Sequence, residues 1–78
     1  MPAYLALVTV RGDLDRDDVD GMADALGARR TETDHGVLRL WVPGEAPDLP
    51  TAAHAARQHA AEVLDGYEHD VEVEEDAP

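Results

Sequence analysis

The sequence predicts a small α+β domain in which a four-stranded antiparallel sheet is covered on one face by two helices. Three observations lead to this prediction. Four short segments have the composition of strands, two segments have apolar residues at helical spacing, and their order along the 78 residues is βαββαβ. A chain of this length holds one domain. We place it at residues 1–74 and expect residues 75–78 to form an acidic disordered tail.

The first strand is predicted at residues 3–10, and because both of its faces are apolar we expect it to be central in the sheet. We assign its Leu5 and Leu7 side to the helices. The first helix follows, with Asp15 as its N-cap and Gly27 as its C-terminal stop. Its apolar stripe has the spacing i, i+3, i+4, i+7 and consists of Val19, Met22, Ala23 and Leu26.

The middle of the chain predicts a hairpin of a polar edge strand at residues 28–33 and an apolar strand at residues 37–42, joined by the turn Asp34-His35-Gly36. Residues 43–47 are predicted as a loop. A second helix begins after the capping residue Asp48 and ends at Gly66, with small alanines toward the sheet. Alternation at residues 67–74 predicts the last strand. This order gives a ferredoxin-like sandwich with strand order 4-1-3-2.

The residues that the chain lacks exclude several kinds of chemistry. It has no Cys, Ser or Lys, which removes disulfides, thiolate metal sites and the commonest covalent nucleophiles. The further absence of Asn, Ile and Phe indicates a GC-rich genome. Residues 1–8 lack the basic start of a signal peptide, and the apolar runs are too short for a membrane span, so we expect a cytoplasmic protein.

The net charge of −12 is concentrated in two blocks. Residues 13–24 contain six Asp and one Arg, and residues 68–78 contain six acids and no base. Phosphate contacts require Lys and Arg, so we expect no direct binding of nucleic acid and no binding of anionic membranes. Capping and the helix dipole account for much of the first block. The second block is predicted to give an acidic surface on the last strand, made of Glu68, Asp70, Glu72 and Glu74.

No motif predicts a catalytic residue, a metal site or a cofactor. Asp13, Asp15, Asp17 and Asp24 match positions 1, 3, 5 and 12 of a calcium loop, but Asp18 stands where the loop needs Gly. On the second helix, His59 and Glu62 are neighbours, whereas His54 lies about 140° around the helix from His59. We interpret these side chains, with His35 and His69, as solvated.

The strongest functional candidate is the outer face of the sheet. If Leu5 and Leu7 face the helices, the other apolar side of the first strand lies on this outer face. Apolar sheet faces on small domains are typical of protein interfaces. The predicted interface residues on the two central strands are Tyr4, Val8, Val10, Val37, Arg39 and Trp41.

The leading hypothesis is a non-enzymatic binding or regulatory module that self-associates as a homodimer through this face; a basic protein is an alternative partner. Two other hypotheses remain open. The acidic blocks are compatible with a nucleic-acid-mimicking inhibitor of the anti-restriction or anti-CRISPR type, and the fold also occurs in small dimeric α+β-barrel-type enzymes.

Overall fold

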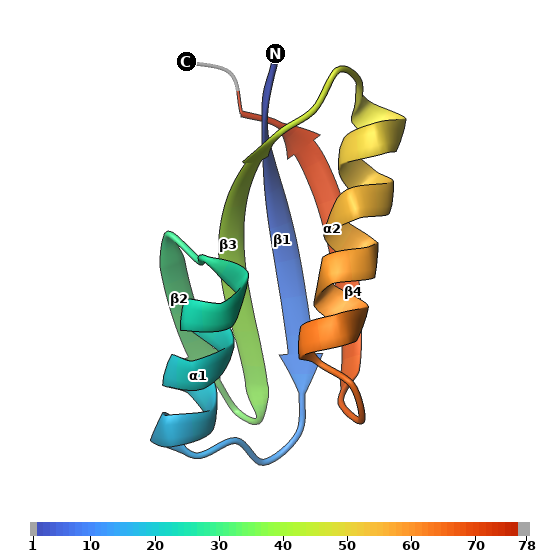
Figure 1. Ribbon diagram of the computed structural model, residues 1–78. Helices are drawn as coiled ribbons and strands as arrows, with labels where there is room; N and C mark the ends of the chain where they lie inside the picture. The colour runs from blue at the N-terminus through green and yellow to red at the C-terminus, as the bar shows by residue number, and fades with distance from the viewer. Residues whose placement is uncertain (1, 77–78) are drawn as a thin grey trace.

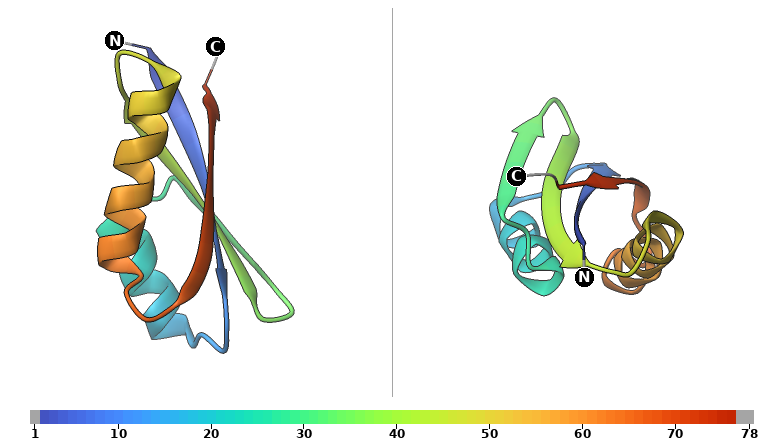
Figure 2. Two further views of the ribbon diagram at one scale, coloured as in Figure 1. Left: turned by 90° about the vertical axis from the view of Figure 1, so that its right-hand side faces the viewer. Right: turned by 90° about the horizontal axis from the view of Figure 1, so that it is seen from above.

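The computed structural model describes residues 2–76 and has the predicted ferredoxin-like α+β fold. Four antiparallel strands lie in the order β2-β3-β1-β4, with two helices on one face (Figures 1 and 2). The elements are β1 (Ala3–Arg11), α1 (Arg16–Leu26), β2 (Arg30–Asp34), β3 (Val37–Glu45), α2 (Leu49–Val63) and β4 (Glu68–Glu75). Neither helix within residues 2–76 is long and apolar enough to cross a membrane.

The two faces of β1 are the reverse of the sequence-based assignment. Tyr4, Val8 and Val10 point toward the helices and are buried, at 6%, 1% and 0% exposure. Leu5 and Leu7 alternate with them, are half-buried and lie on the outer face. The prediction that Tyr4, Val8 and Val10 form an outer interface is therefore wrong. These three side chains belong to the core, since burial between the sheet and the helices removes more apolar surface from water.

Helix α1 begins and ends where its sequence predicts. The Asp15 side chain accepts a hydrogen bond from the Asp18 backbone N–H, and the Asp18 side chain accepts one from the Asp15 N–H, which completes a capping box. At the other end Gly27 adopts a left-handed conformation with φ of 70°. Met22 and Leu26 are buried against β3 and α2, as the predicted stripe requires.

Helix α2 packs on β1 and β4 through small side chains. Asp48 caps it by accepting a 2.9 Å hydrogen bond from the Thr51 backbone N–H. Ala60 and Leu64 join the main core, while Ala52 joins a second small cluster with Tyr4 and Ala46. The second cluster contains no residue of α1, because this helix of 11 residues covers only one end of the sheet (Figure 1).

The hairpin differs from its prediction at both strands. β2 begins at Arg30 instead of residue 28, and β3 continues through Pro43 and Gly44 to Glu45, which the sequence assigns to a loop. A proline fits here because the Trp41 carbonyl accepts from the Arg29 N–H on the β2 side. The Pro43 nitrogen, two residues on, faces the same side but lies beyond Arg30, the first residue of β2, so no hydrogen bond is needed there.

The last strand also extends beyond its prediction. Glu75 belongs to β4, the Asp76 N–H donates a 3.0 Å hydrogen bond to the Ala3 carbonyl, and the Asp76 carboxylate lies 3.4 Å from the Arg29 guanidinium. Glu75 is thus part of the sheet instead of a tail, and Asp76 is hydrogen-bonded to the backbone of β1 just beyond the strand. Residues 77 and 78 of the predicted tail lie outside the described residues.

Candidate functional site

The outer face of the sheet carries a contiguous apolar patch across its two central strands. Leu7 of β1 lies directly opposite Trp41 of β3, and Leu5 lies opposite Pro43. Both helices lie on the other face of the sheet (Figure 2). We call Leu5, Leu7, Trp41 and Pro43 the outer apolar patch. Cross-strand neighbours are about 5 Å apart, so the four side chains form one surface.

Trp41 is held in place by a cation on the neighbouring strand. The guanidinium of Arg30, its cross-strand partner on β2, lies over the indole ring at 4.8 Å from the ring centroid. Arg30 is also paired with the carboxylate of Glu32. The stack covers part of the indole, and Trp41 remains half-buried instead of fully exposed.

A shallow depression of about 250 Å³ lies between the outer apolar patch and β4. Leu5, Leu7 and Trp41 form its apolar side, and Glu72 and Glu74 form its acidic side. A long side chain with an apolar stem and a cationic end matches this arrangement, because its stem can contact the leucines while its charge meets the carboxylates.

The acidic row on β4 consists of Glu68, Asp70, Glu72 and Glu74, which occupy every second position and are all exposed. Their partners on β1 are the outward-facing residues of that strand, so the row lies on the outer face. Glu32 and Asp34 of β2 flank the opposite side. Counted with Arg11, Arg30 and Arg39, the acidic row and the two β2 carboxylates make six carboxylates and three guanidinium groups, a net charge of −3.

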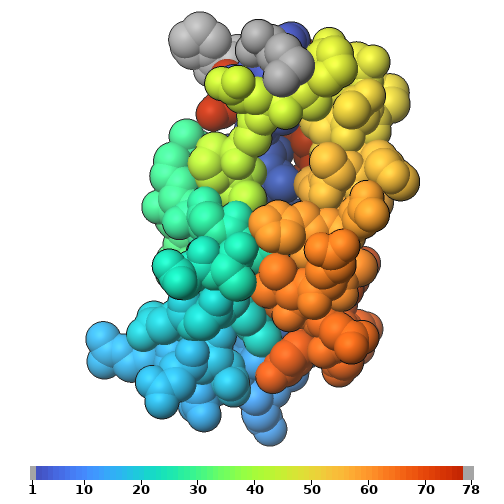
Figure 3. Space-filling view, in the orientation of Figure 1, coloured from blue at the N-terminus to red at the C-terminus, as the bar shows by residue number. Residues whose placement is uncertain are grey.

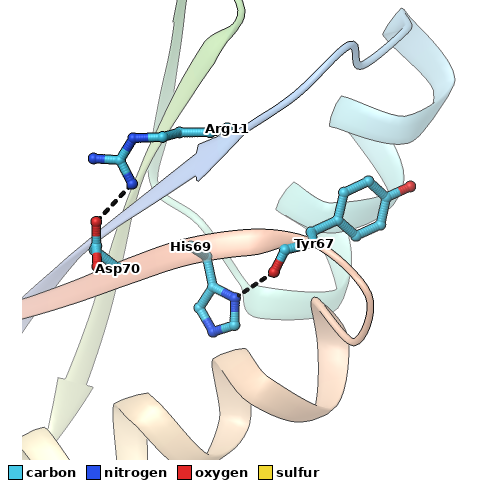
Figure 4. Close-up of polar contacts among 4 residues, drawn as sticks. All are labelled: Arg11, Tyr67, His69 and Asp70. Carbon is cyan, nitrogen blue, oxygen red and sulfur yellow. Dashed lines mark hydrogen bonds and ion pairs between the residues drawn. The ribbon is translucent and has the colours of Figure 1, made fainter.

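At the lower end of this face Arg11 forms an ion pair with Asp70, with 2.6 Å between guanidinium nitrogen and carboxylate oxygen (Figure 4). The hydrogen bond and the charge of Asp70 raise the pKa of Arg11 above its already high ordinary value. His69, which precedes Asp70 on β4, points to the other side of the strand, and its Nδ1–H donates to the Tyr67 carbonyl at 3.0 Å (Figure 4). The pair neutralises one carboxylate of the acidic row and leaves the other three.

The four histidines lie on separate elements or on an exposed helix face. His35 is at the hairpin tip, with φ of 45° and a nearly fully exposed side chain 3.3 Å from Asp34, and His54 and His59 are exposed on α2. Among residues 2–76 no three His, Asp or Glu side chains converge in a way that could hold a metal ion. Asp13, Asp15, Asp17 and Asp24, which match a calcium loop in sequence, instead lead into and form part of helix α1.

The two acidic blocks of the sequence do not form one surface. The first surrounds the start of α1, on the helix side of the sheet, whereas the described part of the second runs along the whole of β4, from the end of the sheet near the start of α1 to the opposite end (Figure 1). The acidic row therefore acts with its own neighbours on the outer face and not with the helix.

Of the six predicted interface residues, Val37, Arg39 and Trp41 lie together on the outer face. The prediction missed Leu5, Leu7 and Pro43. A usable signal was present on β1, because Thr9 and Arg11 share the phase of Leu5 and Leu7 and mark that side as the one facing water.

No family model, curated protein or solved structure shows significant similarity to this chain.

Proposed function

We propose that this protein is a non-enzymatic binding module that takes a protein partner on the outer face of its sheet. The observation that supports the proposal is the outer apolar patch, in which Leu5, Leu7, Trp41 and Pro43 are contiguous and left uncovered by the helices. Apolar surface exposed at the centre of a sheet and surrounded by charged residues is typical of an interface.

Charge favours a basic partner over a second copy of the chain. Two outer faces packed together would bring twelve carboxylates and six guanidinium groups into one interface, a net charge of −6. Like charges at an interface oppose association. A partner with Lys or Arg beside apolar residues would instead place a cation near Glu72 and Glu74 and its side-chain stem on Leu5 and Leu7.

The proposal is tested by calorimetric titration of the full chain with an extended synthetic peptide in which lysine and valine alternate. We expect binding that weakens with added salt. Neutralising Glu68, Glu72 and Glu74 to Gln should weaken binding about tenfold, and Leu7→Ala should weaken it several-fold. The matched control changes Asp13, Asp20 and Asp24 to Asn, which removes the same charge from the helix side of the molecule.

An equal loss of affinity in the two triple variants would show that only net charge matters and would overturn the proposal. Light scattering tests whether a second copy of the chain, instead of a basic partner, occupies the outer face. A stable homodimer at micromolar concentration that Trp41→Ala converts to a monomer would replace the basic partner with a second copy on the same face.

A further inference from the structure

Strand β4 forms an open edge of the sheet. It is the last strand in the order β2-β3-β1-β4, so within residues 2–76 it is paired with another strand, β1, on one side only. The left view of Figure 2 shows this free edge toward the viewer, with α2 to one side of it and no other element in front. β4 has eight residues, whereas β2, at the opposite edge, has five. β4 therefore presents the longer free edge.

The register of β4 on β1 identifies which backbone groups of this edge are free. The Asp76 N–H donates to the Ala3 carbonyl. In an antiparallel pair such hydrogen-bonded positions alternate with positions whose N–H and C=O point away from the partner. The residues of the acidic row therefore bond to β1, and His69, Val71 and Val73 direct their N–H and C=O groups to the free edge. An unpaired edge of this kind is a template for pairing with another chain.

The side chains on the helix side of this edge are incompletely covered. Val71 packs against the main core and Val73 against the second cluster, yet both remain half-buried. In the view from the helix side, α2 hides most of β4 (Figure 3). A hollow of about 540 Å³ lies beside the edge, with Arg57 and Val71 lining it from the helix side and Glu72 from the outer side. Apolar side chains placed along the edge would remove more of Val71 and Val73 from water.

The two sides of the edge differ in charge, which restricts the partner. On the outer side lie the carboxylates of the acidic row, of which Asp70 is already paired with Arg11. On the helix side lie the guanidinium of Arg57 and the imidazole of His69. A strand that fits both sides carries Lys or Arg on its outer face and uncharged apolar residues on its inner face. Two β4 edges paired antiparallel would place carboxylates opposite carboxylates, which disfavours a second copy of the chain.

We propose that the free edge of β4 binds a basic segment of the partner as a fifth, antiparallel strand, with its cations beside the acidic row and its apolar side chains beside Val71 and Val73. This inference rests on the proposed function, because it specifies how the basic partner is bound. Antiparallel pairing is the more stable arrangement per residue. It also places the hydrogen-bonding residues of the partner directly opposite His69, Val71 and Val73, so these partner residues are the ones with apolar side chains.

The test uses three capped octapeptides of alternating lysine and valine, which match the length of β4 and are each titrated calorimetrically into the full chain. One is unmodified, one is N-methylated at its two central valines, and one is N-methylated at its two central lysines. In the proposed pairing the valine N–H groups donate to β4 and the lysine N–H groups point away from it. N-methylation of the valines should therefore weaken binding about tenfold or more, and the matched N-methylation of the lysines should change it by less than about twofold.

Hydrogen exchange of the isotope-labelled protein gives a second readout that needs only the unmodified peptide. The amides of Val71 and Val73 should exchange about tenfold more slowly when the peptide is bound, because they then donate to its carbonyl groups. The amides of Glu72 and Glu74 already bond to β1 and are the internal control, with little change expected.

Equal affinities of the two methylated peptides, or a loss with the lysine-methylated peptide alone, would overturn the fifth strand, as would unchanged exchange at Val71 and Val73. If the unmodified peptide nevertheless binds with the charge dependence given above, the proposed function stands and the partner is held by the outer face alone. If the unmodified peptide does not bind, the proposed function itself fails. The calorimetric titration therefore separates a failure of the binding mode from a failure of the function.

Discussion

Two leucines on neighbouring strands allow a direct measurement of which side of the sheet is the core. Leu40 of β3 is 0% exposed, under the helices, whereas Leu7 of β1 is half-buried on the outer face. Leu40→Ala removes a fully buried side chain, with an expected loss of about 2–5 kcal/mol in the free energy of unfolding. Leu7→Ala removes contacts on one side only, and we expect a loss of about 1 kcal/mol.

These losses are large relative to the stability of so short a domain. At about 0.05–0.15 kcal/mol per residue, 78 residues give a free energy of unfolding of about 4–12 kcal/mol. Leu40→Ala should therefore shift the urea midpoint strongly, and in thermal unfolding each kcal/mol corresponds to about 4–8 °C. The assay is urea unfolding followed by circular dichroism at two protein concentrations. Equal losses for the two variants would refute the assignment of faces, and a loss for Leu7→Ala that grows with protein concentration would show that a second copy buries the outer face.

Three further predictions concern the helix ends. Asp15→Ala should lower the free energy of unfolding by about 1 kcal/mol because it removes the capping box of α1, and Asp15→Ser should retain most of that stability in the same urea assay. Gly27→Ala should lower the free energy of unfolding by about 1–2 kcal/mol in the same assay. An added Cβ would meet nothing within 4 Å, so this loss comes only from the left-handed backbone conformation, with φ of 70°. Hydrogen bonding from the Thr51 side chain and backbone lowers the pKa of Asp48 in the folded protein. The Asp48 carboxylate therefore adds its full contribution to the free energy of unfolding above the unfolded pKa of about 3.9, and this contribution is lost as pH falls through the lower pKa of the folded state. The stability difference between wild type and Asp48→Asn, measured by urea unfolding across that pH range, should shrink with falling pH; a constant difference would contradict the assignment.

The sequence was most informative where one local interaction determines the structure. The capping side chains of Asp15 and Asp48, the stop at Gly27 and the tight turn at His35 and Gly36 each act within a few residues, and the structure confirms them. The order of elements and the sheet topology are confirmed as well, because few arrangements join two helices and four strands with such short connections.

The errors occur where the outcome depends on residues far away in the chain. Both faces of β1 are apolar, so periodicity alone does not decide which one meets the helices, and the decision depends on packing against α2 and α1. The extension of β3 through Pro43 depends on where β2 begins, at Arg30 opposite Trp41, and the strand at Glu75 depends on a hydrogen-bonding partner more than 70 residues away. The part of the inner face that α1 leaves uncovered is also missed, because a pattern of strands and helices does not show that an 11-residue helix reaches over only one end of the sheet.

The central place of β1 also determines when this domain can be completed during synthesis. Its hydrogen-bonding partners are β3 and β4, and β4 is the last element of the sheet to leave the ribosome. Until residue 75 has emerged, β1 has one unpaired edge and Val8, Val10 and Val71 lack their full set of neighbours. Such non-local pairing slows folding, and unpaired apolar strands tend to associate with other chains. The nascent chain therefore passes through a stage in which β1 is paired with a neighbouring strand on one side at most. When β4 pairs with the other side of β1, β4 becomes the edge of the sheet, and the charge of its acidic residues opposes association with other sheets.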